Sequence, residues 1–369
     1  MTKARRIAEL ISARIISEGH LAGDKNHVGN PGAGASFAAT QGQEGEYEET
    51  ELYRGLEVVS VVYRNGKAAE GENSEIEDEV VIHAKGRMTK DFLASMTKEI
   101  DGVKVTVEES TLVHVDPEEA YKYSGGASLY ERNGKIACGS SCATATGFPG
   151  TLGALVTRTG EEGLFILSCS HVLSACDVIR RGMPILAPAP DDAKPEGHLP
   201  LSIARLTKTM PMQHGHYSHE NVCEIDAAVG KVVDATHLTS WQGPNDDLGY
   251  DTPSQVIEPT FPMKVKKYGR STGLTHGFIT GEGAGNMAVP YEAKKFKGTM
   301  WFKNHVAVAA NSGPFALPGD SGSLVVTEDG EAAVGLLFSI NGKGDKGYII
   351  SIGRVLDAFA ATLVSGHNT

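Results

Sequence analysis

From residue 150 to residue 351 the sequence is a succession of short apolar segments separated by residues that favour turns. Ten of them have the length and the Val, Ile, Leu and Phe content of strands: 151–157, 164–167, 203–206, 227–233, 265–268, 277–280, 300–302, 322–326, 333–339 and 347–351. Glycine supplies many of the turns, since 44 of the 369 residues are glycine, or about 12% against an average near 7%. Many short strands with Gly-rich turns predict a mainly β domain, built as a sandwich or a barrel.

Two segments of a different kind begin the chain. Apolar residues at helical spacing between residues 3 and 18 predict an amphipathic helix. Residues 21–50 are rich in Gly, Ala, Asn and Gln and end in the acidic run 44–51, a composition typical of a linker or a mobile loop. We therefore expect residues 1–51 to be a helix followed by a Gly-rich linker.

A small α+β domain is predicted for residues 52–110. Its elements would follow in the order ββαβ, with strands at 56–63, 79–84 and 103–107 and a short helix at 90–96. Thr89 is expected to cap that helix, because its hydroxyl can accept from an unpaired amide of the first turn.

The remaining boundaries are set by composition. Residues 111–148, which carry Gly, Ser and two cysteines, are predicted to be a linker, and residues 149–365 to be the main domain. The apolar segment 352–364 predicts a C-terminal helix.

Composition excludes several classes of protein. A formal net charge of −12 argues against a nucleic-acid-binding protein, which would carry a basic stripe. No apolar run approaches the 18 or so residues of a membrane span, and residues 1–20 lack the features of a secretory signal. Because five cysteines are few and odd in number, we expect free thiols and a cytoplasmic location. They are Cys138, Cys142, Cys169, Cys176 and Cys223.

The strongest local motif is Pro-Gly-Asp-Ser-Gly-Ser at residues 318–323. It presents Ser321 on a tight turn just before a strand, where its hydroxyl can act as a nucleophile. The small residues allow the backbone N–H groups of Gly319 and Ser321 to point at one spot, as an oxyanion hole requires. The motif is not Gly-x-Ser-x-Gly, so the nucleophile elbow of α/β-hydrolases does not fit.

A serine hydroxyl needs a base, and the base needs a carboxylate to orient it. His171 follows an apolar strand at a strand-to-turn junction and is the best candidate base. Asp226 is the candidate acid, because it stands alone at the head of an apolar strand, where an unpaired charge would be costly. Its rivals are Asp234, Asp246 and Asp247. The order His–Asp–Ser along the chain is that of the chymotrypsin type.

Residues 150–355 resemble the chymotrypsin-like, or trypsin-like, serine peptidases. The matches are SCSHVLS around His171, EIDAAVG around Asp226 and GDSGSLVV around Ser321. Two further motifs, GTLGALV at 150–156 and YGRSTGLTHG at 268–277, resemble the intracellular NARROW LEAF 1-related group. The resemblance implies a double β-barrel with a small N-terminal unit before it, which residues 52–110 would supply.

The resemblance also implies where the substrate side chain binds. The primary pocket would be lined by the stretch six residues before the serine and by the strand after it, which gives Phe315, Leu317 and Ser339. No acid stands at the pocket base, so we expect a small or apolar residue, rather than Arg or Lys, before the cleaved bond.

Two departures from the secreted members bear on activation. Val172 stands where these carry a cysteine after the base, so the usual disulfide of that loop is not expected. No start of the IVGG type precedes Gly150, so Asp320 is expected to have a partner other than a newly cut N-terminus.

One cluster of histidines and a cysteine could also be interpreted as a metal site. His214, His216, His219 and Cys223 offer ligand atoms, but their irregular spacing in a Gly-rich, polar segment favours a surface loop. We expect no metal and no cofactor.

The sequence thus predicts a serine endopeptidase that hydrolyses peptide bonds through an acyl-enzyme. Two alternatives stay open: a latent or autoinhibited binding module on the peptidase fold, and an esterase with the same triad. The expected partner is a protein or peptide substrate rather than nucleic acid or membrane, and the N-terminal helix could pack against a second copy of the chain.

Overall fold

The computed structural model describes residues 1–17, 19–21, 56–65, 77–85, 88–96, 98–110, 129–145, 147–196, 199–214, 221–293 and 296–369. Several predictions fall outside these residues. They are the linker after residue 21 with its acidic run, residues 111–128 of the second linker, and His216 and His219 of the histidine-rich segment.

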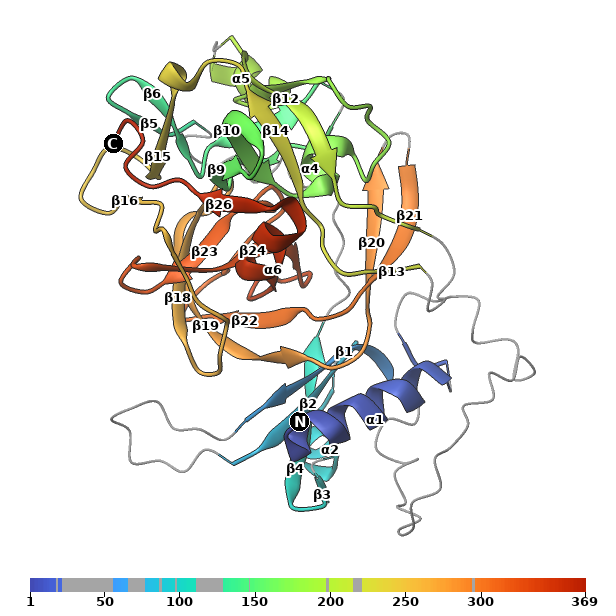
Figure 1. Cartoon of the computed structure of the whole chain (residues 1–369). Helices are drawn as coiled ribbons and strands as arrows, with labels where there is room; N and C mark the ends of the chain where they lie inside the picture. Colours follow the sequence, from blue (N-terminus) through green and yellow to red (C-terminus); the bar gives the residue numbers. More distant parts are fainter. Residues whose placement is uncertain are drawn as a thin grey trace.

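The first sheet has eight strands in the order β26-β9-β10-β14-β12-β11-β7-β8, and every pair is antiparallel. The strands are β7 (Ser141–Thr144), β8 (Gly150–Thr151), β9 (Ala154–Arg158), β10 (Glu161–Ser168), β11 (Pro184–Ala187), β12 (Leu201–Thr209), β14 (Ala228–Val232) and β26 (Ala361–Leu363). This sheet curls into a half-barrel (Figure 1).

The second sheet contains a closed barrel. Strand β18 pairs with both β19 and β23, and β24, β25 and β22 complete the ring. The strands are β18 (Lys264–Gly269), β19 (Gly273–Gly283), β22 (Val306–Ala310), β23 (Leu324–Thr327), β24 (Ala332–Ile340) and β25 (Lys346–Ser351), with the short β17 (Gln255–Val256) beside β24. Apolar side chains such as Val265, Ile279, Phe315 and Ile349 form one cluster within it.

A shared apolar core joins the two barrels. It contains Leu152 and Phe165 from the first barrel together with Leu324 and Phe338 from the second, all of them fully buried. The predicted double β-barrel is therefore confirmed, and each of the ten predicted strand segments contains or overlaps a strand.

The N-terminal unit has the predicted elements and one strand more. They are α1 (Lys3–Ser17), β1 (Glu57–Arg64), β2 (Glu79–Lys85), α2 (Lys90–Ser95), β3 (Lys98–Ile100) and β4 (Val103–Ser110). Thr89 caps α2 as predicted, because its Oγ1 accepts from Phe92 N at 3.2 Å. Strand β2 pairs antiparallel with β1 and parallel with β4.

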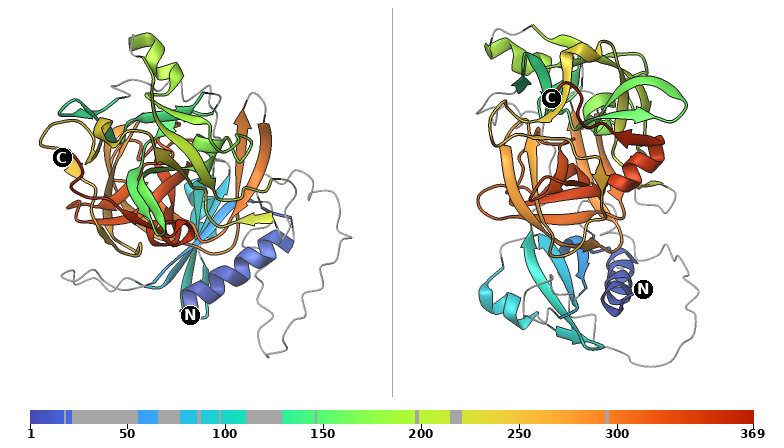
Figure 2. Two further views of the ribbon diagram at one scale, coloured as in Figure 1. Left: turned by 45° about the horizontal axis from the view of Figure 1, so that its top comes forward. Right: turned by 60° about the vertical axis from the view of Figure 1, so that its left-hand side comes forward.

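This unit shares a sheet with the second barrel. Strand β1 pairs with the end of β19, with Val62 opposite Gly283 and Tyr63 opposite Glu282. Eleven strands thus form one hydrogen-bonded sheet. Figures 1 and 2 show the N-terminal unit, in blue and cyan, at one end of the orange barrel.

The described part of the predicted linker 111–148 contains strands. Strands β5 (Glu131–Arg132) and β6 (Lys135–Cys138) form a small sheet with β15 (Leu238–Gln242) and β16 (Tyr250–Asp251), and β7 belongs to the first barrel. The linker prediction was wrong for these residues because their strands are only two to four residues long, and β6 and β7 also pair with the distant strands β15 and β11.

The predicted C-terminal helix is shorter than expected. Helix α6 (Ile352–Phe359) ends where Ala360 adopts a left-handed φ of 49°. Leu363 then pairs with Val156 in β26 and β9. The sheet edge offered by β9 therefore takes residues that helical spacing alone would have kept in the helix.

The remaining elements connect these sheets. They are α4 (Ser170–Ser174), α5 (Pro190–Glu196), η4 (Ala235–His237), and a three-stranded sheet of β13 (Val222–Cys223), β20 (Met287–Ala293) and β21 (Phe296–Phe302). None of the helices in the described ranges combines the length and apolar character needed to cross a membrane.

Candidate active site

The pairing of β10 with β14 brings His171 and Asp226 together. In this antiparallel pair Ser168 lies opposite Ala228. The residues just after β10 and just before β14 therefore meet at the same end of the sheet. His171 stands in α4, directly after β10, and Asp226 lies two residues before β14.

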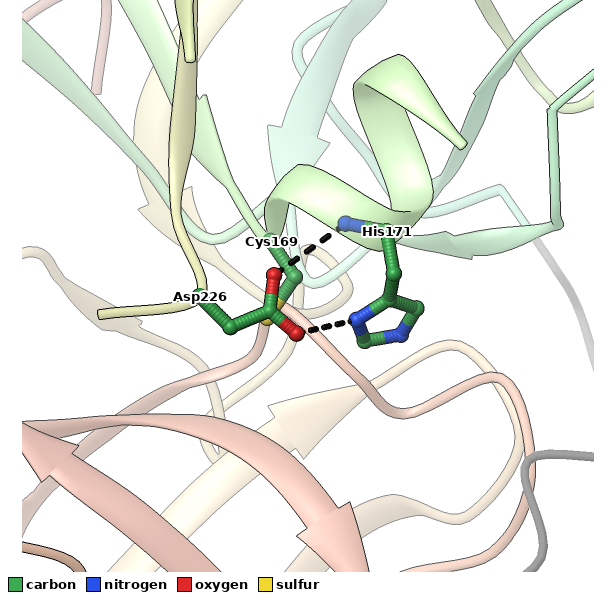
Figure 3. A group of neighbouring side chains, drawn as sticks. All are labelled: Cys169, His171 and Asp226. Carbon is green, nitrogen blue, oxygen red and sulfur yellow. Dashed lines mark hydrogen bonds and ion pairs between the residues drawn. The ribbon is translucent and has the colours of Figure 1, made fainter. Parts of the chain in front are cut away.

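Two hydrogen bonds join these residues (Figure 3). His171 Nδ1 lies 2.5 Å from Asp226 Oδ2, and the backbone N–H of His171 donates to Asp226 Oδ1 at 3.1 Å. Asp226 has no exposed surface and His171 is 1% exposed. Such hydrogen bonds compensate the cost of burying the carboxylate.

The rival acids lie elsewhere. Asp234 is exposed and accepts from Thr236, while Asp246 accepts from the amides of Leu248 and Gly249. Asp247 is also exposed.

Ser321 lies on the turn before β23, next to the helix that carries His171. The amide of Gly322 and the thiol of Cys169 both donate to the carbonyl of Leu337, at 2.8 and 3.2 Å. Thr151 N in turn donates to Ser321 O at 2.8 Å. Within the described ranges Ser321 Oγ makes no hydrogen bond, and such bonds are often long in enzymes without substrate.

Gly319, one of the two residues predicted to form an oxyanion hole, has a left-handed backbone. Its φ is 101°, and a Cβ there would collide with the guanidinium of Arg270 and the hydroxyl of Ser271. The amides of Gly319 and Ser321 donate to no acceptor among the residues that the structure places. Both donors are therefore available to a ligand.

Asp320, between these two amides, is buried and has an internal cation as its partner. Lys267 Nζ lies 3.4 Å from Asp320 Oδ2, and both side chains have no exposed surface. Burial lowers the pKa of Lys267, and the Asp320 charge opposes that shift. The expectation that Asp320 pairs with a group other than a cut N-terminus agrees with this geometry.

Hydrogen bonds complete the surroundings of Asp320. Its carboxylate accepts from the amides of Ser271, Thr272 and Leu317 and from the Thr272 hydroxyl, at 2.7 to 3.2 Å. Most of these donors belong to the YGRSTG segment. The residues after β18 thus hold the turn at residues 318–322 in place.

Another residue of the YGRSTG segment, Arg270, is held by an ion pair. Arg270 is 2% exposed and donates from Nε to Asp192 Oδ2 at 2.6 Å, with a second contact from Nη2 to Oδ1. A buried ion pair therefore ties the segment to α5 of the first barrel.

The three predicted pocket residues differ in exposure. Phe315 has no exposed surface and packs in the core of the second barrel, and Ser339 is 1% exposed. Leu317 is partly exposed. Phe315 is thus a core residue here, because the barrel closes around its ring.

Cys169, His171 and Asp226 are the residues of this site that could hold a metal ion, since their ligand atoms lie within 4.8 Å of one another. Burial raises the pKa of the Cys169 thiol well above its usual value, and His171 Nδ1 is engaged by Asp226. The group is therefore arranged for hydrogen bonding rather than for metal binding. His214 and Cys223 do not join it.

Sequence reasoning missed two residues of this site. Lys267 lies in an ordinary strand, and Tyr291 Oη donates to Asp226 Oδ2 at 3.0 Å from a hairpin 65 residues away. Neither has a local signal, because a buried partner for a charge can come from any part of the chain.

Part of the chain is similar in sequence to known proteins. Residues 251–361 match the family described as the Nal1 C-terminal domain. Over 213 residues the chain is 30% identical to Protein NARROW LEAF 1 of Oryza sativa subsp. japonica, covering 53% of this chain and 34% of that protein. The chain is thus similar in sequence to NARROW LEAF 1 over about half of its own length. The predicted resemblance is confirmed, although the chain spans only about a third of that relative's length.

The segment that matches the Nal1 C-terminal domain contains Lys267, Tyr291 and Ser321, whereas His171 and Asp226 precede it. The match to the Nal1 C-terminal domain thus covers the strands of the second barrel.

Two solved serine proteases are similar as well. A glutamic acid specific serine protease is 18% identical with a TM-score of 0.41, and Thermobifida fusca Protease A is 17% identical with a TM-score of 0.43. Each alignment covers 62% of this chain and 100% of the other. The fold assignment itself rests on the strand pairing described above.

Proposed function

We propose that this chain is a serine endopeptidase that hydrolyses peptide bonds through an acyl-enzyme. The observation that carries the proposal is the buried hydrogen bond of 2.5 Å between His171 Nδ1 and Asp226 Oδ2. A carboxylate on Nδ1 keeps the proton there and leaves Nε2 free to act as a base. Within the described ranges His171 Nε2 makes no hydrogen bond.

In this proposal each step of the acyl-enzyme reaction is assigned to a residue. Ser321 Oγ attacks the scissile carbonyl carbon while His171 Nε2 accepts its proton, and Asp226 stabilises the imidazolium that forms. The amides of Gly319 and Ser321 hold the negative oxygen of the tetrahedral intermediate. His171 gives the proton to the leaving amine, and water later cleaves the acyl-enzyme with His171 again as base.

A fluorophosphonate probe tests this proposal. We expect it to label the wild-type chain and not Ser321→Ala, because the probe needs an activated serine. Peptide hydrolysis should fall by about a thousandfold or more in Asp226→Asn, since the imidazole loses its orienting charge. Asp234→Asn, which removes an exposed rival acid, is the control. Labelling of neither the wild type nor Ser321→Ala contradicts the proposal.

A latent peptidase is the second candidate. It is favoured by the absence, within the described residues, of a hydrogen bond from Ser321 Oγ to His171. Removal of residues 1–148 is a poor test of latency, because it deletes β7 of the first barrel and uncovers the edge of β19. A latent site instead predicts labelling of Ser321 that appears only after a peptide or partner is added.

We also propose a cytoplasmic location. All five cysteines are free and buried, which suits a reducing compartment. The expected partner remains a protein or peptide substrate.

A further inference from the structure

Tyr291 contacts both the candidate acid and the candidate base. Its hydroxyl donates at 3.0 Å to Asp226 Oδ2, the same oxygen that His171 Nδ1 contacts. Its ring lies 5.2 Å from the imidazole, centroid to centroid, at an interplanar angle of 49°. Tyr291 is 1% exposed.

The Tyr291 hydroxyl can serve only as a donor at this place. Burial and the neighbouring Asp226 charge raise its pKa well above the usual value, so the proton stays on the oxygen at any working pH. Asp226 therefore has three donors: the backbone amide of His171, the imidazole of His171 and Tyr291.

We propose that Tyr291 is a positioning residue of the active site. Its hydroxyl fixes the rotation of the Asp226 carboxylate and shares the charge of Oδ2, and in this way it sets both the orientation and the basicity of His171. The inference rests on the proposed function, because it assigns a role within the same triad.

Strand pairing fixes the position of the β20–β21 hairpin that carries Tyr291. Strand β21 pairs in parallel with β13, with Val222 opposite Trp301 and Cys223 opposite Phe302. Cys223 precedes Asp226 by three residues. Strand β20 pairs with β21 along its length, so Tyr291 belongs to the same small sheet as β13, the strand that ends three residues before Asp226. Figure 1 shows this sheet beside the two barrels.

The two faces of the hairpin pack against different parts of the molecule. Val289 and Tyr291 point into the core shared by the two barrels. Ala288 and Trp301 belong to the apolar cluster of the N-terminal unit, together with residues of α1 such as Ile11. The N-terminal unit thus supports the hairpin from the side opposite the triad.

Other titratable groups near Asp226 keep one charge state in the neutral range. The thiols of Cys169, Cys176 and Cys223 stay neutral because burial raises the pKa of each. Glu224 stays ionised, because Lys303 and Arg354 lower its pKa. A change in the pH profile on altering Tyr291 is therefore a change in the His171–Asp226 pair.

The test is Tyr291→Phe, which removes the hydroxyl and keeps the ring. We expect kcat for a peptide substrate to fall roughly tenfold with little change in KM, the factor expected for one hydrogen bond to a charged group. The acid limb of kcat/KM should move to higher pH by about half a unit or more, because a less neutralised Oδ2 stabilises the imidazolium better. Tyr348→Phe is the matched control, since Tyr348 is fully buried in the same core cluster and is not a donor to Asp226.

A second readout does not depend on activity. The far-downfield proton resonance of His171 Nδ1–H, assigned by its loss in His171→Gln, should shift in Tyr291→Phe and stay in place in Tyr348→Phe. An unchanged resonance in folded Tyr291→Phe overturns the role of Tyr291, even in a chain with no peptidase activity. An unchanged kcat and pH limb in an active chain overturns it as well. An inactive, unlabelled wild type with a shifted resonance contradicts the proposed function alone.

Discussion

At the scale of single residues, the site is organised by buried charges that are each paired. Asp226 is held by His171 and Tyr291, and Asp320 by Lys267 and the amides of the following turns. A buried charge without such partners would cost several kcal/mol. The pairing of Asp320 therefore determines which conformations of the turn at residues 318–322 are accessible.

The charge on Lys267 can be tested directly. Lys267→Met removes the ammonium and leaves Asp320 buried without its cation, which should lower the free energy of unfolding by about 3–5 kcal/mol. If the turn at residues 318–322 becomes more mobile, the amides of Gly319 and Ser321 are no longer held in position, and kcat/KM should fall roughly ten- to hundredfold. Urea denaturation and peptide hydrolysis measure the two effects.

Lys266→Met is the control for this change. Lys266 is the neighbouring residue on the same strand, but it is partly exposed and lies over the ring of Tyr250. Equal effects of the two substitutions would contradict a specific role for the Lys267–Asp320 pair.

At the scale of elements, helix α1 packs one face against the rest of the chain. Its buried residues are Ala4, Ile7, Ala8, Ile11, Ser12 and Ile15, whose spacing places them on one side of the helix. They contact the cluster that also contains Ala288 and Trp301 of the β20–β21 hairpin. Gly285, just before β20, lies so close to Ser12 that a Cβ there would collide with it.

Substitutions at two neighbouring residues of α1 distinguish the effect of packing on stability from the effect of helix propensity. Ile11 is 5% exposed and Leu10 is 63% exposed. Ile11→Ala should lower the free energy of unfolding by about 2–5 kcal/mol, because it leaves a cavity in the cluster. Leu10→Ala should change it by less than about 0.5 kcal/mol. Similar losses in the two variants, measured by urea denaturation, would show that α1 does not pack as described.

At the scale of the whole molecule, two histidines are buried where the N-terminal unit joins the second barrel. Burial lowers the pKa of His83 to about 4 and that of His305 to about 3, from 6.5. His83 contacts Ser60, while neither ring nitrogen of His305 has a partner among the described residues. Glu108 lies beside His83, with Oε2 3.7 Å from His83 Nε2, and the neighbouring His83 and Lys346 hold the pKa of Glu108 well below its usual range.

These histidines should make the molecule sensitive to acid. Between pH 6.5 and about 4 the unfolded chain binds a proton at each histidine and the folded chain does not, so stability falls as pH falls. Each histidine contributes up to about 1.4 kcal/mol per pH unit in this window. The loss of stability due to His83 stops growing below about pH 4, and the loss due to His305 continues to about pH 3.

His305→Phe tests this account. It removes two buried, unpartnered nitrogen atoms and the proton uptake of one histidine. We expect the free energy of unfolding to change little at pH 8 and its slope between pH 6 and 5 to drop by up to about 1.4 kcal/mol per pH unit, the contribution of one histidine. An unchanged slope, measured by urea denaturation at several pH values, would contradict the assignment of His305.

Much of the fold and of the candidate site could be predicted because their signals are local. The ten strand segments alternate with turns, Thr89 stands at the start of its helix, and the motif at 318–323 contains its own turn. The boundary at residue 148 and the end of the last helix were wrong, since β7 and β26 pair with strands distant in the sequence.

By itself, the sequence determined the strand-rich fold, the order His171, Asp226, Ser321 and the glycine that the turn at residues 318–322 needs. Only the tertiary structure decided that Asp226 rather than Asp234, Asp246 or Asp247 meets the histidine, and that Lys267 and Tyr291 complete the site. The physical reason is that periodicity and turn chemistry act between neighbours in the chain. The pairing of buried charges is instead decided by strand register and by which distant side chains the barrels enclose.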